Sequence, residues 1–226
     1  MHIPDGFLDP DAAAAAAVVS VGVVGYSLRR AEHELDERRV PLLGVTAAFV
    51  FAVQMLNFPV AGGTSGHLLG AALAAILLGP WLACLVMTVV ITSQAFVFAD
   101  GGISALGANV LNMGIVGALG VGYLMVWARH VLPRTRAGFL AIVAGGSWLA
   151  VMVGATATSL ELALSGTVPL GTVLPAMLGV HALIGIGEAV ITVAAVAAVM
   201  VSRPDLLTVR GLGRRAGAAP AVGGAA

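Results

Sequence analysis

The sequence predicts an all-α membrane protein, and its composition, its apolar segments and the positions of its arginines each support this fold class. Hydrophobic residues make up 59% of the 226-residue chain, charged residues make up 10%, and the mean hydropathy is +1.03. A soluble domain averages about 45–50% apolar and about 25% charged residues. The chain is therefore expected to be a multi-pass protein of the cell inner (plasma) membrane.

Seven segments of low charge can form the helices of the bundle. A hydrocarbon core of about 30 Å requires roughly 20 apolar residues for each helical span. We expect about seven transmembrane helices, at residues 12–28, 42–56, 67–78, 81–98, 106–127, 139–160 and 173–201. Residues 1–202 would then form a single transmembrane substrate-binding domain, and residues 203–226, which lack periodicity, are expected to form a disordered cytoplasmic tail.

The basic residues determine the orientation of this bundle. All eleven are arginines, and they fall only on alternate connections, at residues 29–39, 129–136 and 203–215. The opposite connections carry Asp5, Asp100 and Glu161 without any basic residue. Because cytoplasmic loops are enriched in arginine and lysine, we expect the N-terminus outside, the C-terminus in the cytoplasm and an odd number of spans.

The first two residues can chelate a metal ion. The amine of Met1, the amide nitrogen of His2 and the His2 imidazole can close two small rings on one ion, which gives three nitrogens in a plane. Planar nitrogen donors suit Cu(II) and Ni(II), and the set still lacks a fourth nitrogen. The start carries acidic residues and no basic one, unlike a secretory signal, so Met1 is expected to keep its free amine. Taken alone, a Met-His start is a weak signal.

A glycine-rich stretch supplies a candidate for the fourth nitrogen. Only a few residues separate His67 from the break at Gly79 and Pro80, so a helix starting there covers only about 18 Å and His67 lies below the membrane surface. Irregular backbone at that depth must be enclosed by protein, so residues 58–67 and 99–105 are expected to form loops that dip into the membrane. A hydrogen-bonded packing role for His67 is the alternative, although ionisable groups inside a membrane usually mark function.

In two pairs of polar residues, the members are separated by whole turns of a helix. Asn109 and Asn112 are one turn apart and share a face, so they either support the N-terminal segment or join helices by hydrogen bonds. His181 and Glu188 are two turns apart, about 10.5 Å along the axis and too far for a direct bond. An ordinary polar contact with another helix is favoured for each over a proton relay.

Four segments together resemble one family of transporters. The start MHIPDGFLDP and the segments GGTSGHLLGAALAAILLGPW, ADGGISALGANVLNMGIVG and HALIGIGEAVIT are similar to the CbiM/NikM family, the substrate-specific S components of energy-coupling factor (ECF) transporters for cobalt and nickel. The resemblance runs from Met1 to about Ser202. It implies one Ni(II) or Co(II) bound by Met1, His2 and His67. Apart from the resemblance, we expect Ser65, Gln94, Asn109 and Asn112 to support these ligands.

The resemblance also implies partners and a mode of transport. Such a subunit captures Ni(II) or Co(II) as its transported substrate, without an organic cofactor, and works with a transmembrane coupling (T) subunit, two ATPase subunits and in some systems a small accessory membrane subunit. The chain contains no G-x-x-x-x-G-K-[ST] phosphate loop, so it is not the motor. The lipid bilayer also surrounds the chain, and no nucleic acid is expected to bind.

Three other functions were weighed. A stand-alone secondary carrier or channel for divalent metal ions would need a continuous polar pathway, and only His181 and Glu188 lie deep in the expected spans. An intramembrane metalloenzyme would need an open coordination position and a general base, and no H-E-x-x-H motif is present. A structural membrane protein is the third alternative.

Overall fold

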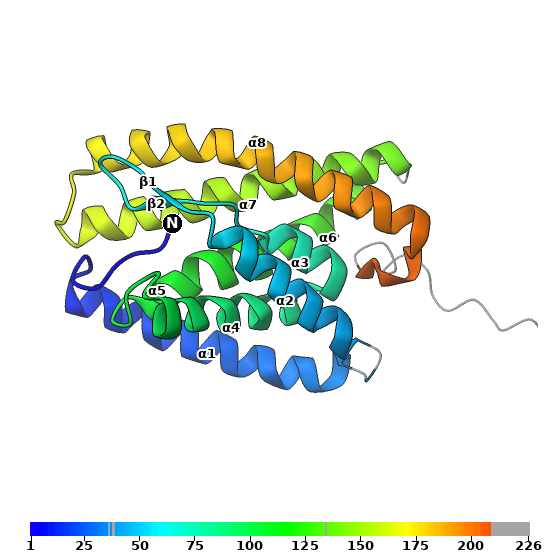
Figure 1. The fold of residues 1–226 in the computed structure, drawn as a ribbon, viewed down its shortest axis with the longest axis horizontal. Coiled ribbons are helices and arrows are strands. Elements are labelled where there is room, and N and C mark those ends of the chain that lie inside the picture. Colours follow the sequence, from blue (N-terminus) through cyan, green and yellow to red (C-terminus); the bar gives the residue numbers. More distant parts are fainter. Residues whose placement is uncertain (36, 38, 134, 209–226) are drawn as a thin grey trace, which may run out of the picture.

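The computed structural model describes residues 1–35, 37, 39–133 and 135–208, and it is almost entirely helical (Figure 1). The elements in chain order are α1 (Pro10–Glu34), α2 (Val40–Gln54), β1 (Phe58–Pro59), β2 (Ser65–Gly66), α3 (Ala71–Leu78), α4 (Pro80–Phe98), α5 (Leu106–Asn109), η1 (Val110–Gly120), α6 (Val121–Val131), α7 (Arg136–Leu164), α8 (Leu170–Ser202) and η2 (Pro204–Leu206).

Each of the seven expected segments contains a helix, which confirms an all-α membrane protein, although the helix expected from residue 67 begins only at Ala71 because Gly70 turns the chain into it. Five stretches in the described chain are long and apolar enough to cross a bilayer, namely α1, α4, the run Leu106–Val131, α7 and α8. Helix α2 has 15 residues and α3 has eight, or about 22 and 12 Å of axial length. Because both are short, the chain between them can turn back inside the bundle.

Helix α1 begins at Pro10, directly after a capping aspartate. The Asp9 carboxylate accepts a hydrogen bond from the N–H of Asp11 at 3.0 Å, and Pro10 is the first helical residue. This cap satisfies one of the N–H groups left free at a helix start. It also ends the N-terminal segment, so that residues 1–8 are free to run back into the bundle (Figure 1).

Helix α3 lies at the centre of the bundle. It follows the antiparallel pairing of β1 with β2, in which Phe58 faces Gly66. All of its residues except Leu77 are buried. Glycines with positive φ values stand at both of its ends, Gly70 at 74° and Gly79 at 89°. A positive φ is little strain for glycine, so the chain can turn sharply into and out of this short helix.

The run Leu106–Val131 changes its hydrogen-bond pattern within one helix. Residues Val110–Gly120 have π-helical geometry between the α-helical turns of α5 and α6. Such stretches occur often at functional sites. The change begins directly after Asn109. Asn109 and Asn112 are both buried, and they have different partners.

Helices α7 and α8 pack along one side of the molecule (Figure 1). A Cβ on Gly185 would lie 2.8 Å from the Trp148 ring, and the indole of Trp148 donates a hydrogen bond to the Ala182 carbonyl at 3.2 Å. Because Gly185 has no side chain, the two helices can approach each other closely.

The segment after α8 packs back on the bundle. Leu207 is 2% exposed, and the Thr208 hydroxyl donates to the carbonyl of Leu77 at the end of α3 at 2.7 Å. Most of the expected cytoplasmic tail, residues 209–226, lies outside the described residues, so the prediction of a disordered tail stays a prediction.

Candidate metal centre

The N-terminus lies inside the bundle rather than at its surface (Figure 1). Met1 and Ile3 are fully buried and His2 is 3% exposed. Asn109 of α5 binds both polar groups of Ile3, because its Oδ1 accepts from the Ile3 N–H at 2.8 Å and its Nδ2 donates to the Ile3 carbonyl at 3.1 Å. The amide side chain thus replaces a strand neighbour for this stretch of backbone, and buried backbone groups need such partners.

The loop before α5 holds the next part of the segment. Gly102 donates its N–H to the Ile3 carbonyl at 2.8 Å, and a Cβ at this glycine would overlap the backbone of Pro4 and Asp5. Asp5 accepts hydrogen bonds from the hydroxyl and N–H of Ser104 at 2.6 and 2.7 Å, and these bonds lower the pKa of its carboxyl. The loop of residues 99–105 therefore covers the N-terminal segment.

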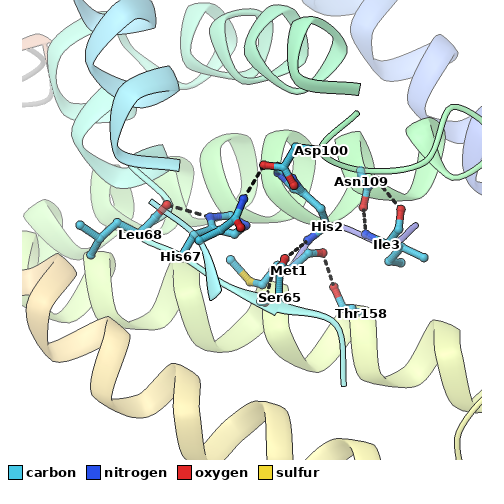
Figure 2. A network of polar contacts seen from close by, with 10 residues as sticks. Met1, His2, Ile3, Ser65, His67, Leu68, Asp100, Asn109 and Thr158 are labelled. Carbon is cyan, nitrogen blue, oxygen red and sulfur yellow. Dashed lines mark hydrogen bonds and ion pairs between the residues drawn. The ribbon is translucent and has the colours of Figure 1, made fainter. Parts of the chain in front are cut away.

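The amine of Met1 lies against strand β2 of the β-hairpin. It donates to the backbone carbonyl of Ser65 and, at 2.9 Å, to the Ser65 hydroxyl, which also accepts from the N–H of His2 at 3.2 Å (Figure 2). Burial lowers the pKa of the amine from 8.0 to about 4. The amine is thus neutral at physiological pH and keeps a lone pair for a metal ion.

His67 lies beside His2. The centroids of the two rings are 4.7 Å apart, with 52° between their planes, and His67 is 1% exposed. Its Nδ1 lies 2.9 Å from the carbonyl of Leu68. Because a carbonyl only accepts, Nδ1 carries the hydrogen and Nε2 has the lone pair, and within the described structure this Nε2 has no hydrogen-bond partner. Metal-bound histidines commonly have this arrangement.

Asp100 contacts the imidazole of His2. Its Oδ1 lies 2.9 Å from Nδ1 of His2, and its Oδ2 accepts from the Asn57 side chain at 2.7 Å (Figure 2). Burial lowers the pKa of His2, although the hydrogen bond with Asp100 opposes that shift. The sequence marked Asp100 only as a charge on the outer side, because nothing in its spacing connects it with His2.

The groups expected to support the ligands are placed in different ways. Ser65 and Asn109 contact the N-terminal segment directly. Asn112 instead donates to Glu161 at 2.6 Å and to Thr158 at 3.3 Å, and Thr158 reaches the Met1 carbonyl at 3.5 Å.

Gln94 is fully buried in α4, and its main-chain carbonyl accepts from the N–H of Asp100 at 3.0 Å. Neither polar atom of its side chain has a hydrogen-bond partner among the described residues. The expected role of Gln94 next to the ligands stays a prediction.

His181 and Glu188 do not bond each other, as their separation predicts. His181 Nδ1 lies 2.7 Å from the carbonyl of Met177 in its own helix. Glu188 accepts from the N–H groups of Leu69 and Gly70, just after His67. This last contact could not be read from sequence, since its acceptor and donors are more than a hundred residues apart.

Within the described residues, no three His, Cys, Asp or Glu side chains gather into a metal cluster. The nitrogen donors that the described structure does bring together here are two imidazoles and nearby main-chain nitrogens. The Met1 amine and the His2 amide are the main-chain nitrogens at the His2–His67 pair, and both now bond Ser65.

Comparison with known proteins assigns the family. The family described as "Cobalt uptake substrate-specific transmembrane region" (CbiM) matches residues 2–206. The chain belongs to this family. Membership makes it a metal transport component of the membrane rather than an enzyme.

Individual members agree in sequence and fold. The chain is 43% identical to a fused nickel transport protein NikMN of Archaeoglobus fulgidus, over 92% of this chain and 68% of that protein. It is 37% identical to the cobalt transport protein CbiM of Sorangium cellulosum, over 92% and 94%. The crystal structure of a truncated transition metal transporter superposes with a TM-score of 0.83 at 33% identity, covering 89% of this chain and 99% of that one.

Proposed function

We propose that this CbiM-family chain is the substrate-binding membrane subunit of an ECF-type importer and captures Ni(II) or Co(II) with Met1, His2 and His67. The observation that supports this most directly is the buried meeting of a neutral amine with two imidazoles at the end of the N-terminal segment. A segment folded this deeply loses much conformational freedom, and ligand binding is a reason to place it there.

The four donors would be the amine of Met1, the amide nitrogen and imidazole of His2, and Nε2 of His67. Four nitrogens in a plane suit Ni(II) and can hold Co(II). The His2 amide must lose its proton to bind, and the amine must turn its lone pair from Ser65 toward the ion. Metal capture therefore exchanges the hydrogen bonds to Ser65 for metal–nitrogen bonds.

The His2 ring must also turn. A chelate that starts at the His2 amide closes a six-membered ring through Nδ1, and in this structure Nδ1 faces Asp100. Rotation about the Cβ–Cγ bond would give Nδ1 to the metal. Asp100 could then accept from Nε2–H, as carboxylates commonly do for metal-bound histidines.

Partner subunits would supply the energy. The chain contains no lysine and so no phosphate-loop motif, which fits a subunit that binds substrate while two ATPase subunits act through a transmembrane coupling subunit. The family description as a substrate-specific region supports this division of labour. ATP hydrolysis would open the site by withdrawing the N-terminal segment, and the ion would pass inward.

Calorimetric titration of the purified chain with Ni(II) and Co(II) tests the site. Adding one residue before Met1, or acetylating its amine, should abolish binding without unfolding the protein, and His2→Ala and His67→Ala should do the same. His33→Ala is the matched control, because His33 is exposed in the described structure, and it should bind as the unmodified chain does. Full affinity after acetylation would disprove the amine as a ligand.

Uptake into liposomes tests the role of partners. Vesicles that contain this chain with coupling and ATPase subunits should accumulate radioactive nickel only when ATP is present inside. Substantial uptake by the chain alone would instead support a secondary carrier.

A further inference from the structure

Two consecutive peptide units follow His67, and the surrounding side chains bind both of them. In the first unit, the Leu68 carbonyl accepts from Nδ1 of His67 at 2.9 Å, and the Leu69 N–H donates to Oε2 of Glu188 at 2.8 Å. In the second, the Leu69 carbonyl accepts from Nε2 of Gln54 at 2.7 Å, and the Gly70 N–H donates to Oε1 of Glu188 at 2.6 Å.

The first peptide unit connects Glu188 with the imidazole. A peptide unit is planar and resists twisting, so the position of its N–H fixes the position of its carbonyl. A carboxylate on the N–H also polarises the unit and makes the carbonyl a stronger acceptor, since hydrogen bonds in a chain strengthen one another at low dielectric. The His67 hydrogen bond therefore depends on Glu188 in both direction and strength.

The place of Glu188 argues against an incidental contact. It lies near the middle of the spanning helix α8 and is 3% exposed, where an acidic residue is costly and usually functional. Both of its oxygens accept hydrogen bonds from the turn that leads into α3. No side chain of its own caps that helix, because its N-cap residue is Gly70, and a carboxylate is favourable at a helix N-terminus.

We propose that Glu188 is a positioning residue for the metal ligand His67, acting through the Leu68–Leu69 peptide unit as a carboxylate–peptide–histidine relay. The relay holds His67 in the tautomer with Nε2 free, aims that nitrogen at the N-terminal amine and increases its basicity. It is the main-chain counterpart of the direct carboxylate–histidine pairs that support many metal ligands. The inference rests on the proposed function, since it assumes that His67 binds the ion.

Titration with Ni(II) and with Cu(II), which serves as a spectroscopic probe for planar nitrogen sites, tests the relay on the full chain with its native start. Glu188→Gln should weaken binding by roughly 10–100-fold, the usual effect of removing a group that supports a ligand. Its Cu(II) absorption band should move to longer wavelength, toward the position expected for His67→Ala, because the His67 nitrogen donates less strongly when it is misplaced. Thr192→Val is the matched control, since Thr192 is buried one turn further along α8, and it should change neither quantity.

A double-mutant cycle separates the relay from a general effect on folding. The cycle is measured with Cu(II), which the three nitrogens of Met1 and His2 can still bind in a His67→Ala background. In that background Glu188→Gln should cause little further loss of affinity, because residues that act through one another are not additive. Glu188→Asp keeps the charge and should show an intermediate affinity, and it also carries the test if Glu188→Gln does not fold. Equal losses from Glu188→Gln in both backgrounds, or an unmodified Cu(II) spectrum in Glu188→Gln, would overturn the relay.

These results differ from a failure of the proposed function. If His67→Ala itself bound Ni(II) like the unmodified chain, His67 would not be a ligand, and the proposed function would fall together with the relay. Loss of binding in His67→Ala with no effect of Glu188→Gln would retain the site and exclude only Glu188.

Discussion

At the residue scale, the main chain has an unusual part in the candidate site. The amine of Met1 and the amide of His2 belong to the backbone, so a substitution can remove only the imidazole donors. Burial holds the amine neutral, with a pKa of about 4 against an ordinary 8.0. In the folded protein the Met1 amine is therefore already unprotonated, so a metal ion does not have to displace a proton from it.

This property predicts how many protons the site releases. Between about pH 4 and 8 the buried amine is unprotonated, whereas the amine of a free chain end becomes increasingly protonated as pH falls. At pH 7, Ni(II) should therefore displace about one proton from the protein, that of the His2 amide. The free peptide Met-His-Ile-Pro-Asp should release about two, because its amine is mostly protonated at that pH. Calorimetry in buffers of different ionisation enthalpy counts these protons. Two protons from the protein would show that its amine is not buried before the ion arrives.

Asp100 gives a second prediction at this scale. Asp100→Asn removes the charge next to His2 and should weaken Ni(II) binding about tenfold or more, because supporting carboxylates typically contribute 10–100-fold to metal affinity. Asp11→Asn removes an exposed acidic group near the start of α1 and should leave the affinity unchanged. Equal affinities for the two variants, measured by titration, would contradict a supporting role for Asp100.

The sequence was enough to select the three proposed ligand residues, but not most of the groups that contact them. Met1 and His2 are adjacent, and the short helix after His67 placed that residue at depth, so each could be found from local pattern and from the family resemblance. Asp100, Gln54 and Glu188 reach the site through contacts between distant segments. No local spacing records such contacts, because they depend on how the helices pack.

At the element scale, the site depends on close approach between a loop and the N-terminal segment. Gly102 lies against the backbone of Pro4 and Asp5, and Gly107 lies in the same way against Ala17 of α1. Neither glycine is required by a positive φ in the structure, so the absence of a side chain is what matters at both places.

Gly102→Ala should therefore displace the N-terminal segment. The added methyl overlaps backbone rather than a flexible side chain, and overpacking of this kind typically costs about 1–3 kcal/mol. Ni(II) affinity should fall by at least about fivefold, while the thermal midpoint of the helical bundle changes little. Gly145→Ala in α7, where a Cβ meets nothing within 4 Å, is the control and should match the unmodified chain in both measurements.

The helices themselves were largely predictable, and their details were not. Apolar length located every predicted helix, since membrane burial imposes a simple composition. The π-helical stretch from Val110 to Gly120 has no comparable signature, and it separates the partners of Asn109 from those of Asn112. Helical spacing thus predicted correctly that Asn109 and Asn112 are both buried, but it did not predict that they contact different residues.

At the scale of the whole molecule, the orientation connects the site with the direction of transport. The N-terminal segment and the loops that cover it lie at the end of the bundle opposite the connection between α1 and α2 (Figure 1). That connection carries arginines, whereas the covering loops carry none. From the positive-inside bias we expect the site to lie on the outer side of the membrane, which is where the proposed capture of metal would take place.

Cysteine labelling of intact cells tests this orientation. In a Cys84→Ser background, which removes the single native thiol, Asp11→Cys should react with a membrane-impermeant maleimide added outside. Glu37→Cys, in the arginine-rich connection, should react only after the membrane is permeabilised; both positions are exposed in the described structure. Labelling with the opposite pattern would place the N-terminal site in the cytoplasm, where it could not take up metal from outside, and an inward-directed capture subunit would be excluded.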